Sequence, residues 1–300
     1  MKAKLVRGCT LACLSFLLWG CSSASFFYNR LDFFLPWYVD GYTNLNAEQE
    51  SFLDERLQPF LDWHRGSELP CYVTLIDQTE AALSEDLTQE EIISLSRNFE
   101  LAWYRTQEEA LDWLLELGEQ LNNEQIEKFL EETREKQAEY EKEYLERSDA
   151  EFAEDSYERM VDTSQDYLGR LQKEQRAVLR TASEKLTRSD TLWLAERAKF
   201  IAALEGLLAR EPGWQQQVRD LIAAQSQAPS PQYQQVLDHN LDIMQQATAE
   251  IVNTRTAKQD KHLRDELQDL RGELQQLAAA ARQPGSCEAE FLQASSEAAL

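Results

Sequence analysis

Helix-start signals recur along the first half of the chain, and they constrain its fold more than any other feature. In a capping box, a polar N-cap side chain and a Glu or Gln three residues later each accept a hydrogen bond from the other's backbone amide. Residues 46–49, 88–91, 122–125 and 148–151 fit this pattern. The pattern predicts several separate helices rather than one long rod.

The balance of aliphatic residues supports the same fold class. The sequence holds 43 Leu but only 16 Val and Ile together. Unbranched side chains keep their rotamer freedom in a helix, whereas β-branched ones lose it. The chain is therefore predicted to be an all-α protein.

Apolar periodicity places the middle helices. Helices are expected over about 89–119 and 123–147, and residues 171–210 are expected to form two helices or one kinked helix, with a break near 187–190. Pro212 and Gly213 end that run. In the helix over about 89–119 the apolar residues fall largely on one face: Ile92, Leu95, Phe99, Trp103, Ala110, Leu114 and Leu117.

A long C-terminal helix is expected after Ser230 and Pro231, which fit the N-cap and N1 positions. Two apolar heptad sets follow, and a stutter at Arg255 and Gln259 joins them. A helix of nearly 50 residues is about 70 Å long and must lie along several shorter ones. The expected fold is an elongated antiparallel helical bundle over residues 26–283, with a loose tail at 284–300.

The first twenty residues have the pattern of a secretory signal peptide. Lys2, Lys4 and Arg7 precede an apolar stretch at 8–19, which is shorter than the roughly 20 residues that span a bilayer. Residues 1–20 are therefore predicted to be removed. Removal takes away three cations and changes the formal charge from −24 to −27.

The end of that segment, Leu18-Trp19-Gly20-Cys21, resembles the bacterial lipobox. The resemblance implies that Cys21 becomes the acylated N-terminus and anchors the protein in a membrane, and that residues 21–25 form a tether. Trp19 departs from the usual small residue. Ser22, in place of Asp, implies the outer membrane, with the protein on its periplasmic face.

An aromatic segment follows the tether: seven of the fourteen residues at 26–39 are Phe, Tyr or Trp. Two placements are open. The segment can lie in the headgroup region of the membrane, which Trp and Tyr favour, or it can pack on the bundle as its first helix. The second placement is the expectation.

Two thiols remain once Cys9 and Cys13 are removed and Cys21 is acylated. They are Cys71 and Cys287, and an even pair in an oxidising compartment favours a disulfide. The alternative is two unpaired thiols.

Charge and motifs exclude several functions. An acidic chain without a basic stripe does not fit nucleic acid. The sequence has no nucleophile elbow, phosphate-binding loop, dinucleotide fingerprint or clustered metal ligands. We therefore predict no enzymatic activity, catalytic residue, metal, cofactor or small-molecule substrate.

One local cluster mixes aromatic, cationic and acidic side chains near Pro59, which predicts a kink. It is interpreted as a joint between helices, and a functional pocket is the alternative. Its members are Trp63, His64, Arg65, Glu68, Pro70 and Tyr72.

These residues also carry a family resemblance. Tyr28-Asn29-Arg30-Leu31-Asp32, Leu35-Pro36-Trp37-Tyr38-Val39, Trp63-His64-Arg65 and Glu68-Leu69-Pro70 with Tyr72 resemble a Gram-negative lipoprotein family of unknown function. Cys71 stands where that family is expected to have a basic residue. The resemblance implies an anchored, helical periplasmic protein and supplies no activity.

A weaker resemblance concerns three Leu-x-x-Glu-Gln segments at 45–49, 121–125 and 171–175. They are similar to the Leu-Thr-x-x-Gln motif of Spy-type periplasmic chaperones, although capping boxes also explain them. Two functions are therefore carried forward. The first is a non-enzymatic anchored protein that binds another envelope protein, and the alternative is a membrane-tethered chaperone.

Overall fold

The computed structural model describes residues 23–227, 230–283, 285 and 287. Every regular element in this part of the chain is a helix, so the predicted all-α class is confirmed. Cys21 and the segment at 1–20 lie outside the described residues.

The aromatic segment forms two helices. Helix α2 spans Ser23–Tyr28 and α3 spans Leu31–Thr43. Helix α2 thus begins inside the segment expected to be a tether. Asn44, in the left-handed region at φ 51°, ends α3, a conformation that Asn tolerates better than most residues.

The next part of the chain is a long helical hairpin. Helix α4 (Ala47–Trp63) passes through a π-helical turn, η1 (His64–Glu68), into α5 (Leu69–Ala82). The expected joint is therefore a wider turn inside continuous helix. Helix α6 (Gln89–Gln120) returns antiparallel.

The central helices follow the predicted starts and stops. They are α7 (Asn123–Leu145), α8 (Asp149–Leu168), α9 (Lys173–Lys185) and α10 (Asp190–Leu207). All four predicted capping boxes are present, and the break near 187–190 is confirmed. Helix α11 (Trp214–Gln227) was not predicted.

The prediction of a single long C-terminal helix is wrong. The structure has two helices, α12 (Pro231–Asn253) and α13 (Ala257–Ala279). Thr256 accepts a hydrogen bond from the Gln259 amide, and the Gln259 side chain accepts one from the Thr256 amide. This capping box starts a new helix where the sequence suggested a stutter, and the chain turns back there.

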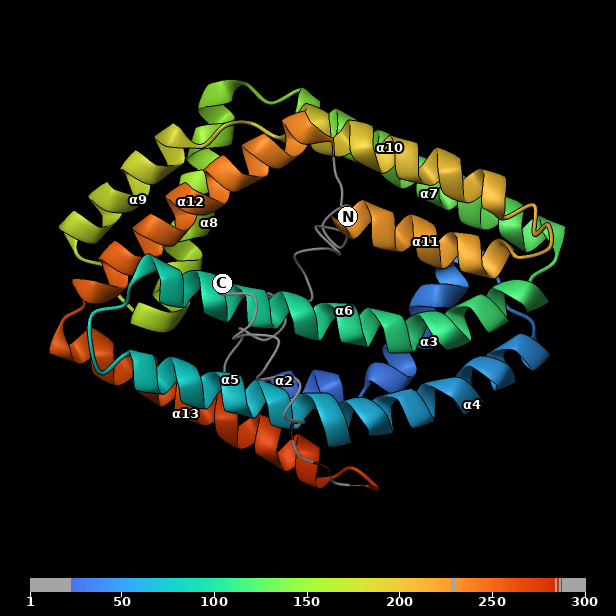
Figure 1. Cartoon of the computed structure of the whole chain (residues 1–300), viewed down its shortest axis with the longest axis horizontal. Coiled ribbons are helices and arrows are strands. Elements are labelled where there is room, and N and C mark those ends of the chain that lie inside the picture. Colours follow the sequence, from blue (N-terminus) through green and yellow to red (C-terminus); the bar gives the residue numbers. More distant parts are fainter. Residues whose placement is uncertain (1–22, 228–229, 284, 286, 288–300) are drawn as a thin grey trace, which may run out of the picture.

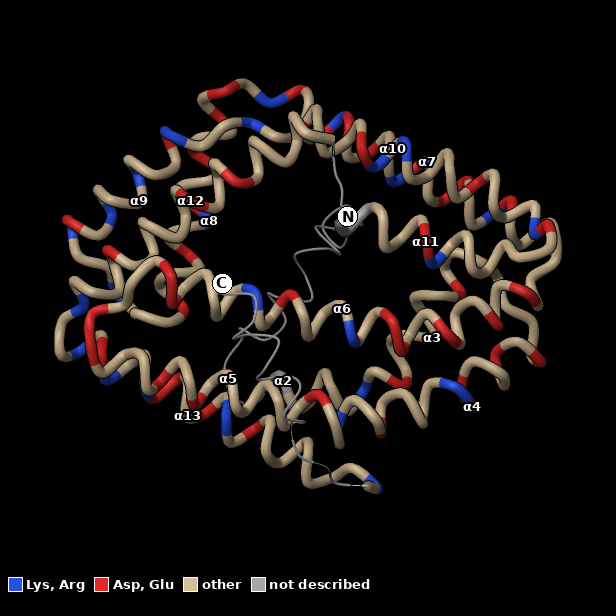
Figure 2. Tube along the Cα trace, viewed as in Figure 1, with Lys and Arg blue, Asp and Glu red and all other residues tan. Residues whose placement is uncertain are grey.

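The helices form an elongated ring, which we call the frame, and α6 runs between its two long sides (Figure 1). The largest core joins α5, α8, α9, α12 and α13; its best-buried members include Leu69, Leu168, Leu179 and Ile251. Smaller clusters join α4 to α6 and α6 to α11. Acidic and basic residues are interspersed along the helices of the frame (Figure 2).

The apolar face of α6 is only partly buried: Ile92, Leu95 and Ala110 are half-buried. Phe99, Trp103 and Leu114 are 40%, 48% and 39% exposed, and only Leu117 of that face is buried. The side that approaches α5 carries Asn98, Ala102 and Arg105 instead. Small Ala102 allows close approach to Cys71 and Leu75. This contact and the pairing of Arg105 with Glu68 together set the rotation of α6.

Paired glutamines fasten the two ends of the frame. Gln49 and Gln125 are buried, and each side-chain nitrogen donates to the other's oxygen. Each nitrogen also donates to a backbone carbonyl before the other's helix, at Gln120 and Asn44. We call this arrangement a glutamine clasp.

A second clasp joins Gln175 to Gln259 at the other end of the frame. Their side-chain nitrogens donate to the carbonyls of Ile251 and Arg170. All four clasp glutamines occupy the third position of a capping box. The Leu-x-x-Glu-Gln segments therefore have a structural role in joining helix starts.

Candidate functional site

Chemistry-bearing side chains gather around the π-helical turn, where α2, α5, α6 and the C-terminal segment meet. We call this region the junction: residues 64–68 with Tyr28, Tyr72, Arg105 and the Cys71–Cys287 pair. It brings together the residues singled out in the sequence and others far from them in the chain.

Pro70 and Gly66 explain how the C-terminal segment reaches the turn. A residue at position 70 of a regular helix would donate its amide to the Gly66 carbonyl, but proline has no amide hydrogen. The Gly66 carbonyl accepts instead from the Gly285 amide at 3.1 Å. A side chain at position 66 would collide with the Gln283 carbonyl, so the approach needs glycine.

His64 lies between two tyrosines. The Tyr28 hydroxyl and His64 Nδ1 share a hydrogen bond of 2.7 Å, and the Tyr72 hydroxyl lies 3.4 Å from Nε2. Arg65 covers the Tyr28 ring, with its guanidinium carbon 5.2 Å from the ring centroid. Burial raises the pKa of the Tyr28 hydroxyl. Tyr28 therefore stays protonated and can donate a hydrogen bond to His64.

Burial, and then the Arg65 guanidinium, lower the pKa of His64 from 6.5 to about 4. His64 is therefore neutral at pH 7 and holds α2 against the turn through hydrogen bonds. A neutral imidazole can act as a base. Here, however, both ring nitrogens face tyrosine hydroxyls, and the arrangement fixes the turn.

Acidification from pH 7 to pH 5 is expected to destabilise the fold through His64. In this window the unfolded chain binds a proton at His64 and the folded chain does not, so falling pH favours unfolding, by about 2 kcal/mol at pH 5. Urea unfolding of the wild type and His64→Gln at both pH values measures the effect. The variant should lose less stability than the wild type, and an equal loss would contradict the low pKa.

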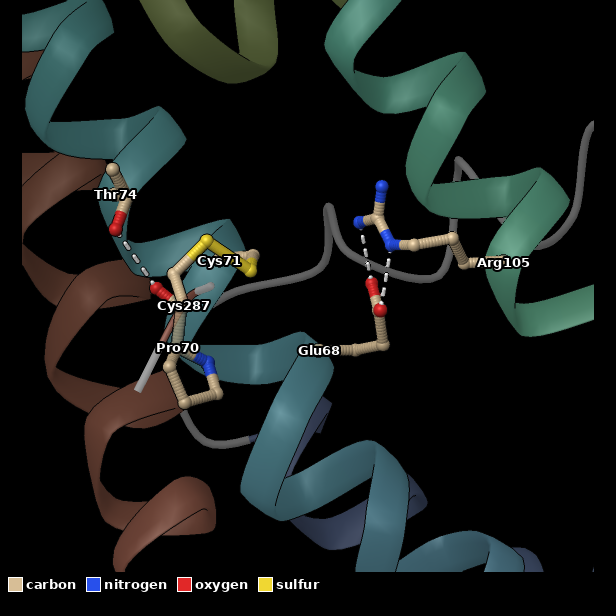
Figure 3. Close-up of a disulfide and its surroundings, with 6 residues drawn as sticks. All are labelled: Glu68, Pro70, Cys71, Thr74, Arg105 and Cys287. Atoms are coloured by element: carbon tan, nitrogen blue, oxygen red, sulfur yellow. Dashed lines mark hydrogen bonds and ion pairs between the residues drawn. A yellow bond between two sulfur atoms is a disulfide. The ribbon is translucent and has the colours of Figure 1, made fainter. Parts of the chain in front are cut away.

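Glu68 is 3% exposed and pairs with Arg105 of α6 (Figure 3). Arg105 Nε and Nη2 donate to the two carboxylate oxygens, each at 2.8 Å. This two-bond geometry is the strong form of an arginine–carboxylate pair. It holds α6 against the turn.

Arg105→Met is expected to lower the free energy of unfolding by about 2–3 kcal/mol, because it leaves the Glu68 carboxylate buried without its partner. The double variant Arg105→Met with Glu68→Gln should recover part of this loss, since it also removes the buried charge. Chemical unfolding of the three proteins measures both effects. Additive losses would show that the two side chains are not coupled.

The C-terminal segment is attached at three points in its described part. The Arg282 amide donates to the Asp62 carboxylate at 2.7 Å, and the Gly285 amide binds Gly66. Cys287 forms a disulfide with Cys71, with an S–S distance of 2.19 Å (Figure 3). Gly285 and Cys287 are thus held, although 284–300 was expected to be loose.

The other predicted joint residues have packing roles. The Trp63 ring lies 5.9 Å from that of Phe60, and the Pro70 carbonyl accepts from the Thr74 hydroxyl. Sequence reasoning missed Arg105 and Gly66 as members of the junction. Arg105 is one of many charged residues on α6, and its spacing carries no signal. Gly66 could have been recognised from the sequence, because it lies between the Trp63-His64-Arg65 and Glu68-Leu69-Pro70 motifs.

The junction has the properties of a structural joint between helices. His64 is paired with two tyrosine hydroxyls and Glu68 with Arg105, while the buried Nε of Arg65 has no hydrogen-bond partner among the described residues. Among the residues that the structure describes, no group of three or more His, Cys, Asp or Glu is placed to hold a metal ion. A surface hollow lies elsewhere, on α7 and the start of α8, and charged side chains line it.

The exposed face of α6 is the better candidate for binding. Phe99 and Trp103 lie one helical turn apart, and Leu114 continues the same side; we call these three residues the α6 stripe. Exposed apolar patches mark interaction sites. Within the described helices, none is long and apolar enough to cross a membrane.

Comparison with known protein families shows which family the chain resembles. Residues 41–234 match the model of a protein family described as a family of unknown function (DUF6279). The matched range includes Trp63 to Tyr72 and Arg105, and it begins after the Tyr28 motif. Neither the curated proteins nor the solved structures contain a match to the chain.

Proposed function

The chain belongs to the DUF6279 family of unknown function, and on that premise we propose that it is a non-enzymatic protein anchored by lipid in the outer membrane. Its helical frame faces the periplasm in this proposal and binds another envelope protein there. The observation that carries the proposal is the α6 stripe. Its three side chains are exposed on a helix that the frame holds at both ends.

Contacts at each end of α6 keep the stripe in place. Near its start, the Asn253 side chain of α12 exchanges hydrogen bonds with the Leu87 backbone. Near its end, Leu117 is buried with Leu53 of α4. A binding face on a rigid element loses little conformational entropy on association. The stripe therefore suits an apolar segment of a protein partner.

The anchor is supported by the sequence around Cys21, and it has a direct test. Cys21→Ser is expected to abolish labelling by a radioactive or clickable fatty acid and to release the protein from the membrane fraction, because the acyl chains attach there. Two or more acyl chains anchor a protein stably, and one does not. Cys71→Ser is the matched control and should keep the label. Acyl labelling of Cys21→Ser would contradict the anchor.

A membrane-tethered chaperone is the second candidate, and the same stripe favours it. Such a protein would bind many unfolded chains rather than one partner. Light scattering from a denatured client, measured with and without residues 22–300, distinguishes the two. Suppression of aggregation that Trp103→Ser abolishes would support the chaperone. No suppression would favour a specific partner.

A further inference from the structure

The outward face of α2 and α3 is aromatic and exposed. Phe33 and Trp37 are each 64% exposed, Phe26 is 54% exposed, and Phe34 is 38% exposed. The helices also have an inward face: Tyr28 packs against the main core, and Val39 packs against the cluster of α4 and α6. Helix α3 is therefore apolar on both sides, a property of helices that are covered on both sides.

Ring contacts make the exposed side chains one continuous surface across the turn between the helices. The ring centroids of Phe26 and Phe27 lie 5.6 Å apart, those of Phe27 and Phe34 6.0 Å apart, and those of Phe33 and Phe34 5.5 Å apart. Trp37 follows Phe33 by one helical turn. We call Phe26, Phe27, Phe33, Phe34 and Trp37 the aromatic face.

The position of this face in the chain indicates what covers it. Helix α2 begins at Ser23, two residues after Cys21. An extended chain spans at most about 3.6 Å per residue, so an acylated Cys21 would hold the start of α2 within about 7 Å of the lipid surface. The aromatic face begins three residues further along.

Charge and composition agree with a lipid surface. Only Arg30, Asp32 and Asp40 are charged among residues 23–43, in a chain of formal charge −24. With a net charge of −1, this part of the protein is repelled only weakly by anionic headgroups. The Arg30 guanidinium lies 5.2 Å from the Phe26 ring centroid at the edge of the face, where it can meet a phosphate. Phe and Trp are the residues with which interfacial helices enter a bilayer.

We propose that the aromatic face lies in the headgroup region of the membrane and so fixes the orientation of the frame on the bilayer. The inference rests on the proposed acyl anchor. Helices α2 and α3 then have two functions: their inward side joins the frame at Tyr28 and Val39, and their outward side enters the lipid. The acyl chains hold the protein at the membrane, and the aromatic face determines the orientation of the frame relative to the bilayer.

The test uses the full-length processed protein in vesicles of phosphatidylethanolamine and phosphatidylglycerol that contain brominated lipid, a quencher of tryptophan fluorescence. Flotation reports the anchor, and quenching reports the aromatic face. Trp37→Phe keeps an aromatic ring and removes the reporting indole, so most of the quenching should disappear. Trp103→Phe, which removes an exposed indole from α6, is the matched control and should leave the quenching unchanged.

The outcomes separate the two proposals. Flotation with quenching that depends on Trp37 supports both. Flotation with equal quenching in the wild type and Trp37→Phe overturns the aromatic-face proposal and leaves the anchor in place. A protein that does not float contradicts both. In cells, a photo-crosslinker at position 33 should capture lipid, and a specific adduct with a protein there would overturn the proposal in favour of a protein partner.

Discussion

Gln175→Ala is expected to lower the free energy of unfolding by about 3 kcal/mol, several times the effect of losing an ordinary helix cap. Gln175 is 1% exposed. Its oxygen accepts from the Gln172 amide, and its nitrogen donates to the Ile251 carbonyl and to Gln259. Truncation leaves these buried groups without partners, and each such group is costly.

Glu151→Ala is the matched control for this prediction. Glu151 occupies the same third position of a capping box, but it lies at the surface, and among the described residues its carboxylate accepts hydrogen bonds from Ser148 alone. Its loss should lower stability by about 1 kcal/mol. Urea unfolding of both variants isolates the contribution of the clasp. Equal losses would show that the Gln175–Gln259 contact adds nothing beyond capping.

The disulfide is expected to have an effect of similar or larger size. Cys71 and Cys287 are 216 residues apart in the sequence, and a cross-link that closes so long a loop restricts the unfolded chain strongly. Replacing both by Ser is expected to lower the free energy of unfolding by about 2–5 kcal/mol. Urea unfolding of the oxidised protein and of the double variant measures the difference.

Peptide mapping without reductant provides the chemical control. Protein from an oxidising compartment should give one linked peptide containing Cys71 and Cys287, and the pair should resist alkylation. The same chain made in a reducing compartment should be alkylated at both residues. Alkylation of both thiols in protein from the oxidising compartment would contradict the attachment of the C-terminal segment at the junction.

Local signals in the sequence predicted the helix starts well, because a capping box is made by residues three apart and needs no tertiary contact. Thr88 with Glu91 and Ser148 with Glu151 form as expected. Thr256 with Gln259 has the same pattern, but apolar residues continue on both sides of it. The heptad spacing concealed this start, and the two C-terminal helices were predicted as one.

Contacts between distant residues could not be predicted in the same way. The apolar residues of α6 fall on one face, as the periodicity indicated, but a different side of the helix is turned towards α5. That side carries Ala102, which packs against Leu75, and Arg105, which pairs with Glu68. Nothing in the local sequence identifies that pair. The role of Tyr28 at His64 is also long-range; it joins two motifs that the sequence showed only as separate segments.

The most direct test of the proposed function is photo-crosslinking from the α6 stripe in living cells. A photoreactive residue at position 103 should give a discrete adduct with one envelope protein, and the same residue at position 99 should give the same adduct. Position 108, also exposed and on the opposite side of α6, should give none. Equal labelling at 103 and 108, or no adduct at 99 and 103, would contradict the proposal that α6 binds an envelope protein.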